Sequence, residues 1–85
     1  MTPECILAID LGTSGPKVAL VTTDGDVLAS EVESTELFLS DGGGAEQDPD
    51  DWWRAIVAAT RRITDRNLVP AEQILAVAVT SQWAG

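Results

Sequence analysis

The chain has 85 residues, with 14 acidic and 5 basic side chains and a formal net charge of −9. This length allows at most one small domain, and the acidic balance disfavours nucleic acids and anionic membranes as partners. One cysteine and no histidine exclude an internal disulfide and any histidine-based triad or zinc site built from this chain alone.

The start of the chain lacks the features of an export signal. Residues 1–4 carry no basic segment, and no apolar run approaches the roughly 20 residues that a membrane span needs. The single cysteine, Cys5, lies within an apolar run and is expected to be a buried structural thiol. We therefore expect a cytoplasmic protein.

The first two predicted strands are short apolar runs. Residues 5–9 are continuously apolar, which favours a strand buried on both faces. Residues 17–23 are rich in β-branched side chains and form the second strand. Asp24 and Gly25 then predict a two-residue type I′ hairpin, and residues 27–38 a third strand. Its glutamates, Glu31, Glu33 and Glu36, indicate an edge position.

A loop over residues 39–47 precedes one predicted helix. Asp48 is a suitable N-cap and Pro49 suits the first helical position. Asp50 and Arg54 are spaced as an i,i+4 ion pair, and the helix is expected to end near Asn67. One apolar stripe follows the helical period, at Trp52, Ile56, Ala59 and Ile63. Both Trp52 and its neighbour Trp53 are assigned to packing.

Residues 74–79 form another continuous apolar run and predict a fourth buried strand. Tight turns make the first three strands antiparallel, in the order 3-2-1. The helical connection places the fourth strand parallel to the first and beside it, because such crossovers are right-handed. One helix covers only one face of this sheet, so the chain alone is expected to be marginally folded and to self-associate.

The turn between the first two strands carries more polar chemistry than a hairpin needs. Asp10 suits Mg²⁺, usually through water, and Lys17 supplies a positive charge. Between them, Gly12 and Gly15 let the backbone approach a ligand closely and leave N–H groups free to point at it. Thr13 and Ser14 add hydroxyl donors. The pattern is not a P-loop, because a strand follows the lysine. Two interpretations stay open: a site for a metal-bound polyphosphate, or a glycine-rich hairpin with a solvated lysine.

Three segments together resemble the amino-terminal start of an FGGY-family carbohydrate kinase, with xylulokinase-type members nearest. They are "AIDLGTSGPKVALVTTDGDVL", "GAEQDPDDWW" and "ILAVAVTSQWAG", and they come in the family's order and spacing. The first is shared with the wider actin-like ATPase superfamily, whereas the second is more specific to these kinases. The resemblance implies an α/β, ribonuclease H-like fold, present here as a partial β-β-β-α-β mixed sheet with strand order 3-2-1-4.

The resemblance also implies cofactors and roles for single residues. The cofactors would be ATP and Mg²⁺, with Asp10 helping to hold the metal. The transferring phosphates would face Gly12, Thr13, Ser14 and Lys17.

The end of the chain would contribute to the sugar site. Gln82 matches a glutamine near the sugar pocket, and Trp83 and Ala84 occupy a pair of positions that differs between members. Glycerol kinases carry Arg-Glu at this pair and xylulokinases Met-His, so Trp-Ala leaves the sugar open. The indole could stack on a sugar or only fill the cleft wall.

The resemblance further implies that residues 1–85 are an incomplete, amino-terminal part of the first of two ribonuclease H-like domains. The general-base aspartate and the adenine site belong to later parts of such kinases, so the chain alone is expected to be inactive. The partners are a small sugar or polyol and ATP, and a homodimer of the full-length protein stays open. The alternatives are a fragment of a non-kinase, actin-like or chaperone-like ATPase, and an acidic interaction module.

Overall fold

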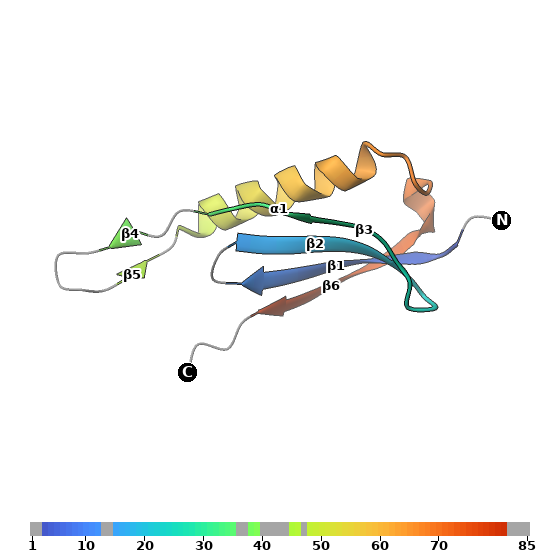
Figure 1. The fold of residues 1–85 in the computed structure, drawn as a ribbon, viewed down its shortest axis with the longest axis horizontal. Coiled ribbons are helices and arrows are strands. Elements are labelled where there is room, and N and C mark those ends of the chain that lie inside the picture. The colour runs from blue at the N-terminus through green and yellow to red at the C-terminus, as the bar shows by residue number, and fades with distance from the viewer. Residues whose placement is uncertain (1–2, 13–14, 36–37, 40–44, 47, 82–85) are drawn as a thin grey trace.

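The structure is a computed structural model that describes residues 3–12, 15–35, 38–39, 45–46 and 48–81. The main sheet has four strands, and Figure 1 shows the long helix lying along one of its faces. In chain order the elements are β1 (Cys5–Gly12), β2 (Gly15–Thr22), β3 (Val27–Val32), β4 (Phe38–Leu39), β5 (Ala45–Glu46), α1 (Pro49–Thr64), the 3₁₀ turn η1 (Ala71–Gln73) and β6 (Ile74–Ser81).

The main sheet has the strand order β3-β2-β1-β6. β1 pairs antiparallel with β2, β2 pairs antiparallel with β3, and β6 lies parallel to β1. The predicted order 3-2-1-4 is therefore confirmed, with β6 as the fourth strand. The crossover through α1 brings the last described residues beside the end of β1, although some 70 residues separate them in sequence.

The core lies between α1 and one face of the sheet. α1 packs mainly over β2 and β3, and it contributes the buried Ala55, Ala59 and Ile63. The strands contribute apolar side chains from the face that α1 covers: Cys5, Leu7, Ile9, Val18, Leu20 and Ala29. The predicted stripe is thus confirmed at Ala59 and Ile63, with the small Ala55 added where the helix approaches the sheet.

The helix begins as the sequence predicts. The side chain of Asp48 accepts a hydrogen bond from the Asp50 amide at 2.9 Å, and Pro49 opens the first turn. The regular helix ends at Thr64, with Asp65 as its C-cap, and a short turn continues to Asn67. Asn67 has a φ of 53°, a left-handed conformation that asparagine tolerates and that turns the chain away from the helix.

The third strand is shorter than predicted. β3 ends at Val32, and residues 38–39 pair instead with residues 45–46 in a separate two-stranded sheet. This second sheet replaces part of the loop expected over residues 39–47. Beyond β3, the Glu33 amide donates a hydrogen bond to the Pro16 carbonyl at 3.2 Å.

The turn between β2 and β3 is not the predicted type I′ turn. The Gly25 amide donates to the Thr22 carbonyl at 2.9 Å, and the Thr22 amide donates to the Asp26 carbonyl at 2.8 Å. Gly25 has a φ of 99°, whereas Asp24 has no positive φ. These features are typical of a type I turn followed by a glycine bulge. This arrangement spares Asp24 the left-handed conformation that a type I′ turn would impose on it.

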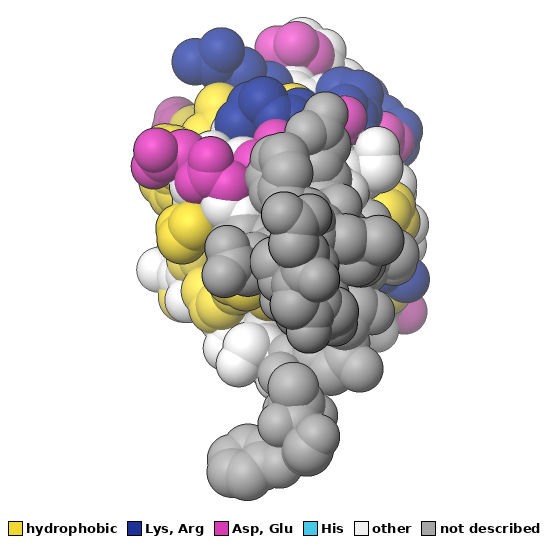
Figure 2. All heavy atoms as spheres, turned by 90° about the vertical axis from the view of Figure 1, so that its left-hand side faces the viewer, with side chains coloured by type: hydrophobic (Ala, Val, Ile, Leu, Met, Phe, Trp, Pro, Cys, Tyr) yellow, Lys and Arg dark blue, Asp and Glu magenta, His cyan; other side chains and the backbone are white. Residues whose placement is uncertain are grey.

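Ion pairs fasten α1 to β3. Arg62 donates to Glu31 at 2.7 Å and also contacts Glu33, and Arg66 pairs with Glu31. Figure 2 shows basic and acidic side chains side by side at the top of the molecule, where α1 lies. The hydrogen bond from Arg62 is the main reason that the pKa of Glu33 lies below its ordinary value. The expected edge position of the third strand is confirmed for β3, which carries Glu31; Glu33 follows β3, and Glu36 lies outside the described residues.

Two expectations for α1 side chains are wrong. Arg54 donates to Asp51, three residues before it, at 2.8 Å. The predicted partner was Asp50, four residues before it. Trp53 is 67% exposed instead of packed in the core, because the helix covers β2 and β3 and leaves its other flank open. Trp52 is half-buried, as a packing role requires.

β6 is not the buried strand that its apolar sequence predicts. Val77 and Val79 are each 59% exposed. The register places them beside Leu7 and Ile9, so they share the α1 side of the sheet but lie beyond the reach of the helix. On the helix-free face of the sheet, Val32, beside Lys17, is 58% exposed. None of the described helices is long and apolar enough to cross a membrane.

Candidate functional site

Polar side chains from three strands form one row at one end of the sheet. The register pairs Asp10 of β1 with Lys17 of β2 on one side and with Thr80 of β6 on the other. All three residues are exposed, and they lie on the face that α1 does not cover, because their neighbours Ile9 and Val18 point into the core. The sheet therefore gathers a carboxylate, an amine and a hydroxyl on one surface.

Each residue of the row lies at the polar end of an apolar strand. Asp10 follows the buried Ile9, and Thr80 follows the run that ends at Val79. Exposure keeps the Asp10 carboxylate hydrated, so its charge costs little there. The Thr80 hydroxyl donates a hydrogen bond to Asp10 Oδ1 at 3.2 Å. Lys17 forms no ion pair within the part of the chain that the structure describes, so its amine is available to an anion.

The two glycines of this hairpin have different reasons to be glycine. Gly15 has a φ of +135°, and a Cβ there would lie 2.0 Å from the Glu33 carbonyl oxygen. Gly15 is therefore required because the backbone after β3 passes close to it. This contact explains the glycine without the ligand approach that the sequence predicted. Among the described residues, a Cβ on Gly12 would meet the Gly15 carbonyl oxygen, at an ordinary 3.6 Å. The described contacts do not require a glycine there, and the ligand approach expected of Gly12 stays a prediction.

Several predicted site residues lie outside the described residues. Thr13 and Ser14 fall between β1 and β2, and Gln82, Trp83 and Ala84 follow the end of β6. The row of Asp10, Lys17 and Thr80 adjoins both segments in sequence. The predicted phosphate-facing and sugar-facing segments are therefore attached to neighbouring strands at the same end of the sheet.

The residues of this row fit Mg²⁺ that is held largely by other ligands. The described residues contain no group of three or more His, Cys, Asp or Glu side chains that could hold a metal by themselves. Mg²⁺ in nucleotide sites usually keeps several waters and takes one or two carboxylates together with phosphate oxygens. The single exposed carboxylate of Asp10 matches that donor set. It is too few ligands for a metal site made by protein side chains alone.

Sequence reasoning missed Thr80. It ended the fourth strand at Val79 and gave no role to the next residue. The strand continues to Ser81, and the parallel register sets Thr80 directly beside Asp10. The available signal was that both residues are the first polar position after an apolar run. Sequence alone did not fix the register that brings them together.

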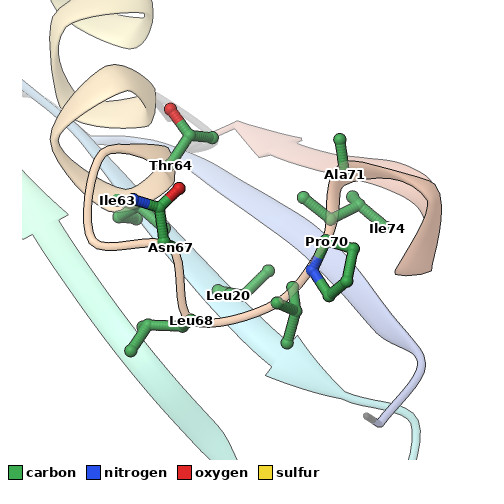
Figure 3. A pocket seen from close by; sticks show the side chains of 9 residues that line it. Leu20, Ile63, Thr64, Asn67, Leu68, Pro70, Ala71 and Ile74 are labelled. Atoms are coloured by element: carbon green, nitrogen blue, oxygen red, sulfur yellow. The ribbon is translucent and has the colours of Figure 1, made fainter.

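Two hollows lie away from this row. An apolar groove of 360 Å³ opens between α1 and the β1–β6 side of the sheet, where Leu7, Trp53 and Val77 contribute to its walls. A smaller cavity of 160 Å³ lies under the C-terminal end of α1, near the start of β6 (Figure 3). Leu20, Ile63 and Ile74 line it, and no acidic or basic side chain does. The walls of both hollows are mainly apolar: Thr60 and Arg61 are the polar residues of the groove, and Thr64 and Asn67 are those of the smaller cavity.

Comparison with known proteins identifies relatives for nearly the whole chain. Residues 5–85 match the family model described as "FGGY family of carbohydrate kinases, N-terminal domain". A xylulose kinase of Escherichia coli (strain K12) is 35% identical over 79 residues, which are 93% of this chain and 16% of that protein. A gluconokinase of Bacillus subtilis (strain 168) is 33% identical over 76 residues, which are 89% of this chain and 14% of that protein.

Solved structures agree with the fold. A crystal structure of gluconate kinase from Lactobacillus acidophilus superposes with a TM-score of 0.82 at 26% identity, and the match covers 95% of this chain and 16% of that one. The predicted ribonuclease H-like, actin-like ATPase fold is thereby confirmed for the part present here. The chain spans about 16% of the length of the relatives that it matches.

Proposed function

Because this chain belongs to the FGGY family of carbohydrate kinases, we propose that it is the amino-terminal part of an ATP-dependent kinase that phosphorylates a hydroxyl of a sugar or polyol. Residues 1–85 would then form the beginning of the first of two ribonuclease H-like domains. A cytoplasmic location is proposed with it, in agreement with the single, buried and free thiol of Cys5.

The observation that carries this proposal is the pairing of Asp10 with Lys17 across the β1–β2 hairpin, next to Gly12. A carboxylate suits a metal ion, and an amine suits phosphate oxygens. A glycine without a packing reason suits close backbone approach. A metal-bound polyphosphate would use all three features together at this exposed strand end.

Phosphoryl transfer depends mainly on positioning and on stabilising negative charge. Asp10 would hold Mg²⁺ through its water shell, and the phosphates of ATP would face Gly12, Thr13, Ser14 and Lys17. The bound metal ion would neutralise the charge that develops on the phosphate oxygens. The chain's own part is to fix these groups on a rigid sheet. The general base is expected later in the longer protein, so the 85 residues alone transfer no phosphate.

The sugar is proposed only as a class. The relatives named above act on xylulose or on gluconate, according to their names. Gln82, Trp83 and Ala84 would face the sugar, with Trp83 either stacking on it or filling the cleft wall. Small sugars or polyols and ATP are the proposed partners. Nucleic acids and membranes are not, because the net charge of −9 repels polyanions. A homodimer of the longer protein is compatible with this function.

The test uses the full-length kinase that contains this chain, assayed with ATP, Mg²⁺ and a panel of sugars and polyols. Asp10→Asn keeps the shape of the side chain but removes its charge, so kcat should fall by about a hundredfold or more. The concentration of Mg²⁺ that gives half-maximal rate should also rise. Asp24→Asn is the matched control, because Asp24 is an exposed carboxylate in the β2–β3 turn. Wild-type turnover by Asp10→Asn at ordinary Mg²⁺ would contradict the assignment.

A further inference from the structure

The hydroxyl of Thr80 has no packing reason to be present. Thr80 is exposed, and the alternate residues before it on the same face of β6 are Ala76 and Ala78. A valine would suit a β-strand equally well. On this face, Ala78 of β6 lies beside Ala8 of β1, and Thr80 lies beside Asp10. The hydroxyl therefore appears where the neighbouring strand presents a carboxylate.

Thr80 is also the only described residue that hydrogen-bonds the Asp10 carboxylate. Its Oγ1 donates to Asp10 Oδ1 at 3.2 Å. Lys17, on the other side of Asp10, forms no ion pair with it among the described residues. Among the described residues, the carboxylate is therefore held by a hydrogen bond from the β6 side.

Threonine is well suited to this task. Branching at Cβ restricts χ1, so a threonine on a paired strand presents its hydroxyl in a defined direction. The carboxylate of an aspartate, by contrast, rotates within a broad range of χ2. A donor fixed on the neighbouring strand reduces this freedom.

We propose that Thr80 is a positioning residue, whose hydroxyl orients the Asp10 carboxylate for the Mg²⁺ of the bound nucleotide. The inference rests on the proposed function, because it requires Asp10 to act on that metal. Oδ1 accepts the bond from Thr80, which leaves Oδ2 for the water shell of the metal ion. Because Gln82 follows the last residue of β6 in sequence, the predicted sugar-facing segment is attached to the strand that carries Thr80.

The experiment compares Thr80→Val and Thr80→Ser in the full-length kinase. Valine keeps the branched shape and the strand propensity but cannot donate, whereas serine keeps the donor. Ser30→Ala is the matched control, because Ser30 is an exposed hydroxyl on the same face of the sheet, on β3. Thermal unfolding of each variant shows whether its fold is intact.

The first readout is binding without turnover. Calorimetry measures the affinity for a non-hydrolysable ATP analogue with Mg²⁺ and again with chelator. Thr80→Val should lose about tenfold in the Mg²⁺-dependent affinity, the lower end of what loss of a ligand-orienting partner costs. Its affinity in chelator should be unchanged. Thr80→Ser should recover most of the loss, and Ser30→Ala should match the wild type.

The second readout is the split of the kinetic constants. Thr80→Val should lower kcat and raise the half-maximal Mg²⁺ concentration, and the KM for the sugar should stay within about twofold of the wild type. An equal loss in Thr80→Val and Thr80→Ser, accompanied by a lower unfolding temperature, would overturn the proposal in favour of a structural role.

The outcomes separate this inference from the proposed function. If Asp10→Asn abolishes the Mg²⁺ dependence while Thr80→Val behaves as the wild type, only the positioning role of Thr80 is wrong. If neither variant changes Mg²⁺-dependent binding, the assignment of Asp10 to the metal is wrong, and both proposals are overturned.

Discussion

The two edges of the sheet are built in opposite ways. β3 is six residues long, and Glu31 on it and Glu33 just after it pair with arginines of α1. β6 is eight residues long, and no charged residue lies in it. Val77 and Val79, on the α1 side of β6, remain largely exposed, because the helix lies over the other half of the sheet.

The difference indicates which strand remains an edge of the sheet in the longer protein. Charged side chains protect an edge from pairing with another chain, and β3 has this protection together with cover from α1. A long apolar strand without charges is typical of the interior of a parallel sheet. β6 therefore has the composition of an interior strand in an edge position, which agrees with a chain that spans about 16% of the length of its relatives.

The largest effect expected from this comparison is self-association of the 85-residue chain through β6. Sedimentation velocity should show oligomers, and added salt should strengthen them by screening the net charge of −9. Replacing Val77 and Val79 together with lysine should give a monomer. The same double change at Val27 and Val32, which are equally exposed on β3, should not. A monomeric wild-type chain with a cooperative thermal transition would contradict this account of β6.

A second effect tests how β3 is held in place, in the monomeric double-lysine background. Gly15→Ala would place a Cβ 2.0 Å from the Glu33 carbonyl oxygen in a left-handed conformation. The strain alone costs about 1–3 kcal/mol of unfolding free energy, and the chain after β3 must also move. Gly12→Ala meets only an ordinary contact and should change the stability much less. Denaturant titration of the two variants measures their free energies of unfolding. Equal losses would show that the contact between Gly15 and the Glu33 backbone does not constrain this position.

The smallest effect concerns the ion pairs of the β3 edge. The pKa of Glu33 lies below its ordinary value of 4.5 because Arg62 donates to its carboxylate. The ionised form is favoured in the folded state, so this contribution is complete at neutral pH and is lost as the pH falls through the lowered pKa. In the same background, Glu33→Gln should lower the unfolding temperature at pH 7, and the difference should shrink below about pH 4.5.

The matched control for this titration is Glu72→Gln. Glu72 is exposed and forms no ion pair within the described part of the chain. Its substitution should change the unfolding temperature little at either pH. A Glu33→Gln difference that stays constant between pH 7 and pH 3.5 would mean that the ion pairs do not help to secure β3.

Local patterns predicted much of this fold. Apolar runs located β1, β2 and β6, the Asp48–Pro49 pair located the start of α1, and the right-handed crossover rule gave the strand order. The end of β3 was not predictable from sequence, because Thr35 and its neighbours read as a continuing strand. The partners of Glu31 and Glu33 depend on where α1 crosses the sheet, which no local pattern determines.

The candidate site was predictable in part for the same reason. Asp10, Gly12 and Lys17 lie within one hairpin, so their proximity follows from the sequence. Thr80 reaches Asp10 only through the parallel register of two strands that are distant in sequence. Local reasoning also assigned Gly15 to the ligand, whereas its contact is with the backbone after β3.

Residue-resolved amide hydrogen exchange on the full-length protein shows whether β6 is an interior strand there. In a strand with one neighbour, only the amides that point to that neighbour are protected, so fast and slow exchange alternate along it. We expect slow exchange at every residue of β6 from Ala76 to Thr80, because the longer protein should supply a second neighbouring strand. Alternation is expected along β3, which remains an edge. Alternation along β6 in the full-length protein would contradict the claim that these 85 residues are the beginning of a larger kinase domain.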